Sequence, residues 1–218
     1  MGNGTIMEIQ THTEKNVVLK RFYPHRQKIS LLTYAHGRIN VSYNLKEQGH
    51  RIWPGMEISG AIERLHDSWN ISEIKIMQTP CFQNHNHMLW LHHILELCYY
   101  FLPLDNPVPE VYFFLQDYYF IIEKSKKLTP SQQVGLHELC VIRFLTLTGA
   151  YHITHIANYI SLFNEIAQGF IDFDDTTCIE YYEKKITLLQ PAKARTWIMD
   201  CLQKHPMIKA FKTVHDLY

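Results

Sequence analysis

Basic and aromatic side chains gather around one alternating apolar segment near the N-terminus, residues 19–41. Ammonium and guanidinium groups neutralise phosphates and aromatic rings stack on bases, so this combination predicts a nucleic-acid-binding surface. A solvated basic edge that discourages strand-to-strand aggregation is the alternative interpretation. The expected contact residues are Lys20, Arg21, Arg26, Lys28, Arg38, Arg51 and Tyr34. Further rings available for stacking are Phe22, Tyr23, Tyr43 and Trp53.

Charge is balanced over the whole chain but not along it. The 218 residues carry 21 basic and 21 acidic side chains, which gives a formal charge of zero. Between Lys15 and Arg51, however, eight basic residues accompany a single acidic one, Glu47. This local excess of positive charge creates a field that attracts a polyanion, although the net charge conceals it.

Fourteen histidines raise the question of a metal site, and the densest group is His85, His87, His92 and His93. No aspartate, glutamate or cysteine near that group completes a familiar ligand spacing, so surface or helix-terminal histidines are the expected interpretation. The five cysteines contain no Cys-x-x-Cys pair, which favours reduced thiols. Because nucleotide-binding and hydrolase motifs are also missing from the sequence, we predict no metal, no cofactor and no enzymatic activity.

Two regions with different hydrophobic periods must position these side chains. Residues 1–80 contain five short, roughly alternating apolar segments separated by turn signals, which predicts β-strands. Strands this few and this short favour a closed barrel, because closure removes exposed edges. Within residues 81–218, apolar residues recur every three or four positions, which predicts helices. The expected fold class is α+β, with a small β-barrel domain at 1–80 followed by an α-helical domain at 81–218.

Finer patterns assign individual positions. Thr129 and Pro130 are expected to begin one helix and Gly149 to close it. Aromatic rings surround another helix at residues 112–120, which predicts a core helix that is covered on every side; the alternative is that part of it lines a groove for a partner peptide. The side chains expected to face into the barrel are Ile29, Leu31, Thr33, Ile39 and Val41, with the charged residues left in loops and on the outer face.

The turn between two of the expected strands carries the motif Leu32-Thr33-x-x-x-Gly37-Arg38. Together with the surrounding residues 19–41, this motif resembles the N-terminal signature of the RecO family of bacterial recombination mediators. Later segments resemble the family in the same order, through the barrel exit and the first helices to the corner formed by Leu145, Gly149 and Tyr151.

The chain also departs from the family pattern. A Gly-Ala-Arg-type basic run usually follows the third strand in the family, whereas only Gly49, His50 and Arg51 stand in that place here. Many members carry a cysteine zinc site in the helical domain, and this sequence has no such spacing.

The resemblance implies an OB-fold barrel and a role in DNA repair. Family members bind single- and double-stranded DNA, anneal complementary strands, and help to load recombinase onto DNA coated with single-strand-binding protein. The implied partners are DNA, a RecR-like protein and the C-terminal tail of single-strand-binding protein. Basic residues beside apolar helix surface are candidate contacts for that tail, and the sequence leaves open a choice among Lys124, Lys126, Lys127 and Arg143.

Other functions fit the same residues. An RNA-binding barrel protein would share the electrostatics, and a protein-interaction scaffold would use the barrel and helices without any nucleic acid. A histidine metal enzyme fits least well. The N-terminus shows no apolar signal segment, and His92, His93 and Glu96 interrupt the longest apolar run. We therefore expect no membrane association and a cytoplasmic location, near the nucleoid if the resemblance to a bacterial mediator holds.

Overall fold

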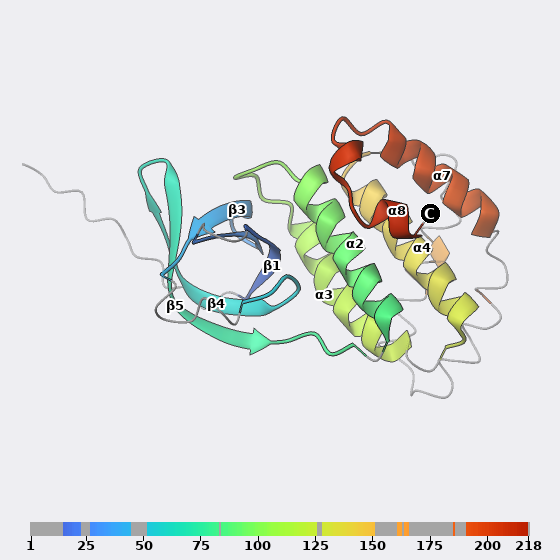
Figure 1. Ribbon diagram of the computed structural model, residues 1–218, viewed down its shortest axis with the longest axis horizontal. Coiled ribbons are helices and arrows are strands. Elements are labelled where there is room, and N and C mark those ends of the chain that lie inside the picture. The colour runs from blue at the N-terminus through green and yellow to red at the C-terminus, as the bar shows by residue number, and fades with distance from the viewer. Residues whose placement is uncertain are drawn as a thin grey trace, which may run out of the picture. The chain divides into compact units, whose positions relative to one another are not determined.

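The computed structural model describes residues 15–22, 27–44, 52–82, 84–125, 128–150, 161–162, 164–165, 185 and 191–217 (Figure 1). The chain divides into two compact units. The barrel unit contains Met1–Pro80 and Pro103–Pro107, and the helical unit contains Cys81–Leu102 and Val108–Tyr218. The short segment Pro103–Pro107 thus groups with the barrel, although the residues on both sides of it belong to the helical unit.

Five strands form a closed barrel in the order β1-β2-β3-β5-β4. β3 and β5 pair in parallel, whereas the other neighbouring strands pair antiparallel. The strand bounds are β1 Asn16–Arg21, β2 Lys28–Thr33, β3 Gly37–Ser42, β4 Glu57–Leu65 and β5 Ser68–Gln78. With the helices that follow, this arrangement confirms the predicted α+β order of a barrel and then helices.

Apolar side chains fill the barrel, because its strands alternate between inward and outward positions. In β3, Ile39 and Val41 are buried while Arg38 is only partly covered. β2 departs from strict alternation, since only Lys28 at its start is exposed and its remaining residues are all buried. The core residues are Val18, Ile29, Leu31, Ile39, Val41, Tyr43, Ile52, Met56, Ile58, Ile71 and Ile74.

Thr33 is buried at the end of β2, and its hydroxyl closes the turn that follows. Its hydroxyl accepts a hydrogen bond from the backbone N–H of His36 over 2.9 Å and donates to the carbonyl of Gly37 over 3.3 Å. A threonine hydroxyl often satisfies backbone groups in this way. The side chain is buried because the tight turn between β2 and β3 folds around it.

The turn between β2 and β3 also binds the segment Pro103–Pro107. Leu104 forms a parallel bridge with Arg38, and the backbone N–H of Asp105 donates to the carbonyl of Arg38 over 2.9 Å. A side-chain bond adds to this, since the Trp69 indole N–H donates to Asp105 Oδ1 over 2.7 Å. These contacts explain why the segment is part of the barrel unit.

Gly37 is required at this contact for two separate reasons. Its φ is +68°, in the left-handed region that residues with a side chain rarely adopt. A Cβ atom at this position would also lie 1.9 Å from the carbonyl oxygen of Asn106, which is far inside van der Waals contact. The glycine of the Leu-Thr-x-x-x-Gly-Arg motif is therefore the residue that allows two backbones to approach.

Three long helices form the first part of the helical unit, and α7 follows later in the chain. The bounds are α2 His85–Phe101, α3 Pro109–Lys124, α4 Pro130–Leu147, α7 Pro191–Gln203, η3 Ile208–Ala210 and α8 Val214–Leu217. Thr129 caps α4 through a capping box with Gln132, and Pro130 is the first helical residue, as the sequence predicted. Among the described residues, no helix combines the length and the apolar character needed to cross a bilayer.

The aromatic helix α3 is covered on one side only. Phe114 and Tyr118 are buried, whereas Phe113 and Phe120 are 54% and 40% exposed. The prediction of a helix covered on every side is therefore wrong. Exposed rings on α3 form an apolar face beside charged residues rather than a second core.

The C-terminal segment of the helical unit is fastened to α2. The Glu96 carboxylate accepts the backbone N–H groups of Lys212 and Thr213 over 2.8 and 2.9 Å. Phe211 is 1% exposed, and its ring centre lies 4.7 Å from that of Tyr100. Charge-assisted and aromatic contacts together fix this segment to the helix.

We predict that Gly37→Ala destabilises the barrel unit more than its backbone conformation alone would require. The left-handed conformation costs roughly 1 kcal/mol for alanine, and overpacking against Asn106 adds about 1–3 kcal/mol. Urea denaturation followed by tryptophan fluorescence measures the free energy of unfolding.

Gly149→Ala is the matched control. Gly149 also has a φ of +68°, but a Cβ atom there would meet nothing within 4 Å. The free energy of unfolding of this variant should therefore fall only by the cost of the left-handed backbone conformation, about 1 kcal/mol. Equal losses in the two variants would contradict the role of the close approach to Asn106.

Candidate functional site

Basic side chains lie against aromatic rings at one end of the barrel. The Arg21 guanidinium carbon lies 5.6 Å from the centre of the Trp53 ring, and the Lys20 Nζ lies 5.7 Å from the centre of the Phe22 ring. Trp53 is 56% exposed, so much of its ring remains open to a ligand. Positive charge beside an open ring is the combination that binds a phosphate and a stacked base together.

The strand pairing brings Lys28 to the same end of the barrel. Arg21 is the last residue of β1 and Lys28 the first of β2, and these strands are antiparallel neighbours. The chain before β4 runs beside β1, since the Gly55 N–H donates to the Val18 carbonyl over 2.7 Å. This contact holds Trp53 near Arg21. We call the residues Lys20, Arg21, Phe22, Lys28 and Trp53 the basic-aromatic end.

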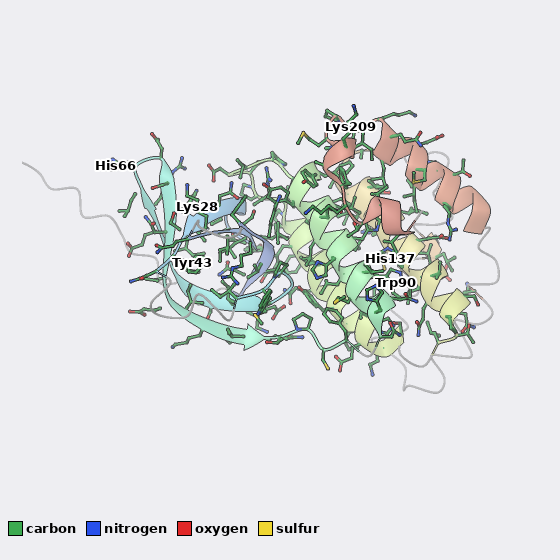
Figure 2. The ribbon with its side chains drawn as sticks, viewed as in Figure 1. Lys28, Tyr43, His66, Trp90, His137 and Lys209 are labelled. Carbon is green, nitrogen blue, oxygen red and sulfur yellow. The ribbon has the colours of Figure 1, made fainter. Side chains whose placement is uncertain are left out.

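A second group forms where the turn between β2 and β3 meets the hairpin between β4 and β5. The Trp69 ring centre lies 4.6 Å from that of His36 and 5.3 Å from the Arg64 guanidinium carbon. Tyr34, at the turn, is 43% exposed. Figure 2 labels Lys28 on the barrel and His66 at the hairpin tip, which lies next to this second group.

Sequence reasoning missed Arg64 and Trp69 as a pair. They lie five residues apart along the chain and pair directly across the hairpin. The signal was the turn at His66 and Asp67, which sets the register of the two strands. Reading that register from the turn would have placed the arginine opposite the tryptophan.

The predicted contact residues fall into several environments. Lys20, Arg21 and Lys28 belong to the basic-aromatic end. Tyr34 and Arg38 lie at the other turn, where the backbone of Arg38 binds Leu104 and Asp105. Arg26 and Arg51 lie outside the described residues, as does Tyr23.

Two residues of the basic segment serve the fold itself. Tyr43 is 4% exposed and packs in the barrel core, so the expectation that it is available for stacking is wrong. Lys15 Nζ lies 3.7 Å from Oε2 of the buried Glu57, so one of the eight positive charges is offset by a nearby carboxylate. The field at the barrel is therefore weaker than the sequence count alone indicates.

Three of the described histidines of the helical unit are buried. His93 Nδ1 lies 3.1 Å from His137 Nε2, and the Tyr118 hydroxyl lies 3.0 Å from His137 Nδ1. His87 Nε2 lies 3.3 Å from Gln133 Oε1. The prediction of surface or helix-terminal histidines is thus wrong for His93, whereas His85 and His92 are exposed and His87, although buried, lies in the first turn of α2.

These histidines form a polar core rather than a reactive site. Neutral imidazole donates from one nitrogen and accepts at the other, so the Tyr118–His137–His93 chain can form in either direction. The Trp90 ring stacks on His137 at 5.5 Å, and both residues are labelled within the helices of Figure 2. In the part of the chain that the structure describes, no three histidine, cysteine or acidic side chains gather as metal ligands would.

Burial determines the protonation states of His93 and His137. It lowers the pKa of His93 to about 3. Burial also holds the pKa of His137 well below 6.5, and the neighbouring His93 lowers it further. Both rings are therefore neutral at physiological pH.

Comparisons with known proteins do not assign this chain to a family. No family model matches it, and a search of curated proteins finds no significant match. The arrangement of side chains is therefore the basis of the functional proposal.

We predict that acid destabilises the helical unit through His93 and His137. Their pKa values in the folded state lie below the ordinary 6.5, so the unfolded chain binds protons first as the pH falls. Stability is complete above about pH 6.5 and is lost below it, by about 1.4 kcal/mol per pH unit for each histidine that stays neutral. Urea denaturation between pH 7 and pH 5 measures this slope.

His93→Gln should make the slope of the free energy of unfolding against pH shallower by the contribution of one proton, about 1.4 kcal/mol per pH unit. This change is expected whatever the effect of the substitution on stability at pH 7. His85→Gln, at an exposed position of the same helix, is the control and should keep the original slope. The same pH dependence in both variants would show that His93 does not contribute to acid destabilisation.

Proposed function

We propose that this chain is a non-enzymatic protein whose barrel binds single-stranded DNA. The observation that carries the proposal is the exposed Trp53 ring with Arg21 against it and Lys28 at the same end of the barrel. A planar ring stacks on any base, and the two cations neutralise the adjoining phosphates. Such a site needs neither a metal nor a nucleophile.

The strand order supports a finer description of the barrel as an OB-fold. OB-folds are five-stranded Greek-key barrels that bind oligonucleotides on strands 2 and 3 and on the loops that join strands 1 to 2 and 4 to 5. Here Arg21 and Lys28 flank the first of these loops, while Arg64 and Trp69 flank the second. The basic and aromatic residues thus occur at both positions that an OB-fold uses.

The resemblance to the RecO family extends the proposal to a recombination mediator in DNA repair. On that proposal, double-stranded DNA, a RecR-like protein and the C-terminal tail of single-strand-binding protein are further partners, and the location is the bacterial nucleoid. Among the candidate tail contacts, the Nζ atom of Lys124 lies 5.5 Å from the centre of the exposed Phe120 ring. An acidic, apolar tail suits this pair of a cation and a ring. Lys126 and Lys127 lie outside the described residues.

We expect Trp53→Ala to weaken binding of a labelled oligothymidine by about fivefold or more. Loss of one stacked base costs roughly 1–3 kcal/mol, which corresponds to about 5- to 150-fold in Kd. Fluorescence anisotropy measures the Kd. Phe113→Ala is the matched control, since Phe113 is 54% exposed but belongs to the helical unit, and its Kd should not change. An unchanged Kd for Trp53→Ala would exclude stacking on this ring.

We further expect the double variant Arg21→Gln/Lys28→Gln to bind DNA with less dependence on salt. Each lost phosphate contact makes the slope of log K against log salt shallower by about 0.7 for a single strand, so the double variant should change it by about 1.4. Lys75→Gln removes an exposed lysine elsewhere on β5 and is the control.

Equal salt slopes in the double variant and the control would remove Arg21 and Lys28 from the binding surface. Competition between DNA and RNA of one sequence then separates a DNA-binding barrel from an RNA-binding one. Absence of any binding at low salt would leave a protein-interaction scaffold as the better explanation.

A further inference from the structure

We infer that the helical unit carries a second phosphate-binding surface, formed by Lys204, Lys209 and Lys212. We call these three residues the C-terminal lysine surface. Its ligand is the sugar-phosphate backbone of a second nucleic-acid strand, an inference that rests on the proposed function of the barrel as the site of the first strand.

The three lysines are grouped along the chain, between the acidic residues Asp200 and Asp216. Residues 201–213 contain these lysines and no aspartate or glutamate. The surrounding region 81–218 is acidic overall, with eleven lysines and arginines against fourteen aspartates and glutamates. All three lysines are exposed. A local positive group in an acidic unit attracts a polyanion to one place on its surface.

Two basic side chains elsewhere in the helical unit have acidic partners. Arg195 donates to Glu138 over 3.0 Å, and Lys185 forms an ion pair with Glu165. By contrast, none of the ammonium groups of the C-terminal lysine surface forms an ion pair with a residue that the structure describes. Within the part of the chain that the structure describes, their charge is therefore not used in an ion pair.

The backbone that carries the lysines is anchored. The Tyr100 hydroxyl donates to the carbonyl of Ala210 over 3.2 Å, and the buried Phe211 packs on α2 beside it. Glu96 directs its carboxylate at the backbone N–H groups of Lys212 and Thr213, so it does not compete for an ammonium group. Binding a phosphate would order only lysine side chains, because the chain beneath them is already fixed.

The chemistry of the group favours a phosphate backbone over a specific base. Lysine is a compact point charge without the planar fork of arginine, and the aromatic residue of this segment, Phe211, is buried. Neither bidentate recognition nor stacking is therefore present. Figure 2 labels Lys209 on this segment. Met207, which is 49% exposed next to the lysines, makes an acidic apolar peptide the competing ligand to be tested.

The test measures capture of a second strand by the full chain. Protein bound to a donor-labelled oligothymidine is titrated with an acceptor-labelled oligothymidine, which cannot pair with the first. Energy transfer between the two labels shows that both strands are bound to the same protein molecule. In Lys204→Gln/Lys209→Gln/Lys212→Gln we expect the first strand to bind as in the unaltered protein. Capture of the second strand should weaken by tenfold or more, and its salt slope should become shallower by about 2.

The charge-conserving variant Lys204→Arg/Lys209→Arg/Lys212→Arg is the control and should retain second-strand capture. Unchanged capture in the glutamine variant would overturn the inference while leaving the barrel proposal in place. If the glutamine variant loses all binding while Arg21→Gln/Lys28→Gln loses none, the barrel proposal fails and the lysine surface stands. The inference would also be overturned, in favour of a protein partner, if the glutamine variant no longer bound a peptide of aspartate and leucine but bound both DNA strands as before.

Discussion

Closure of the barrel depends on two short seams between strands. β3 and β5 pair in parallel through Val41–Trp69 and Ser42–Asn70, and β1 and β4 pair through Asn16–Ile58 and Val17–Glu57. Without the first seam, β3 and β5 would be the open edges of a sheet in which β1 alone holds the β4–β5 hairpin. Because closure carries β5 along β3, Trp69 comes to lie against His36 and within reach of Asp105. The outer features of this unit therefore follow from a few backbone pairs.

A small closed barrel also limits where function can be located. Its interior is filled by side chains, so Tyr43 is used for packing and is lost to any ligand. Exposed rings and cations are left at strand ends and in turns, where Trp53 and Arg21 are found. The helical unit follows a similar rule, since the buried rings of His93 and His137 are hydrogen-bonded to each other and are not exposed to a ligand.

Local patterns predicted local features well. Thr129 and Pro130 identify the start of α4 because a capping box needs only four successive residues. Alternation likewise identified Ile39 and Val41 as inward-facing. Contacts between distant residues could not be read in this way. His93 meets His137 across 44 positions of the chain, and a histidine on an apolar stripe does not reveal whether such a partner exists. The site residues depended on strand register in the same manner.

The allocation of Pro103–Pro107 to the barrel has a consequence for how such a chain can evolve. The polypeptide passes between the two units three times, after Pro80, after Leu102 and after Pro107. Cutting the gene at one point after residue 80 would leave the barrel without the strand-like Leu104 that lies along Arg38. The barrel is therefore not a portable module that a single fusion joint can transfer to another protein. A transfer that keeps this bridge must carry residues 103–107 with the barrel, although they lie inside the sequence of the helical unit.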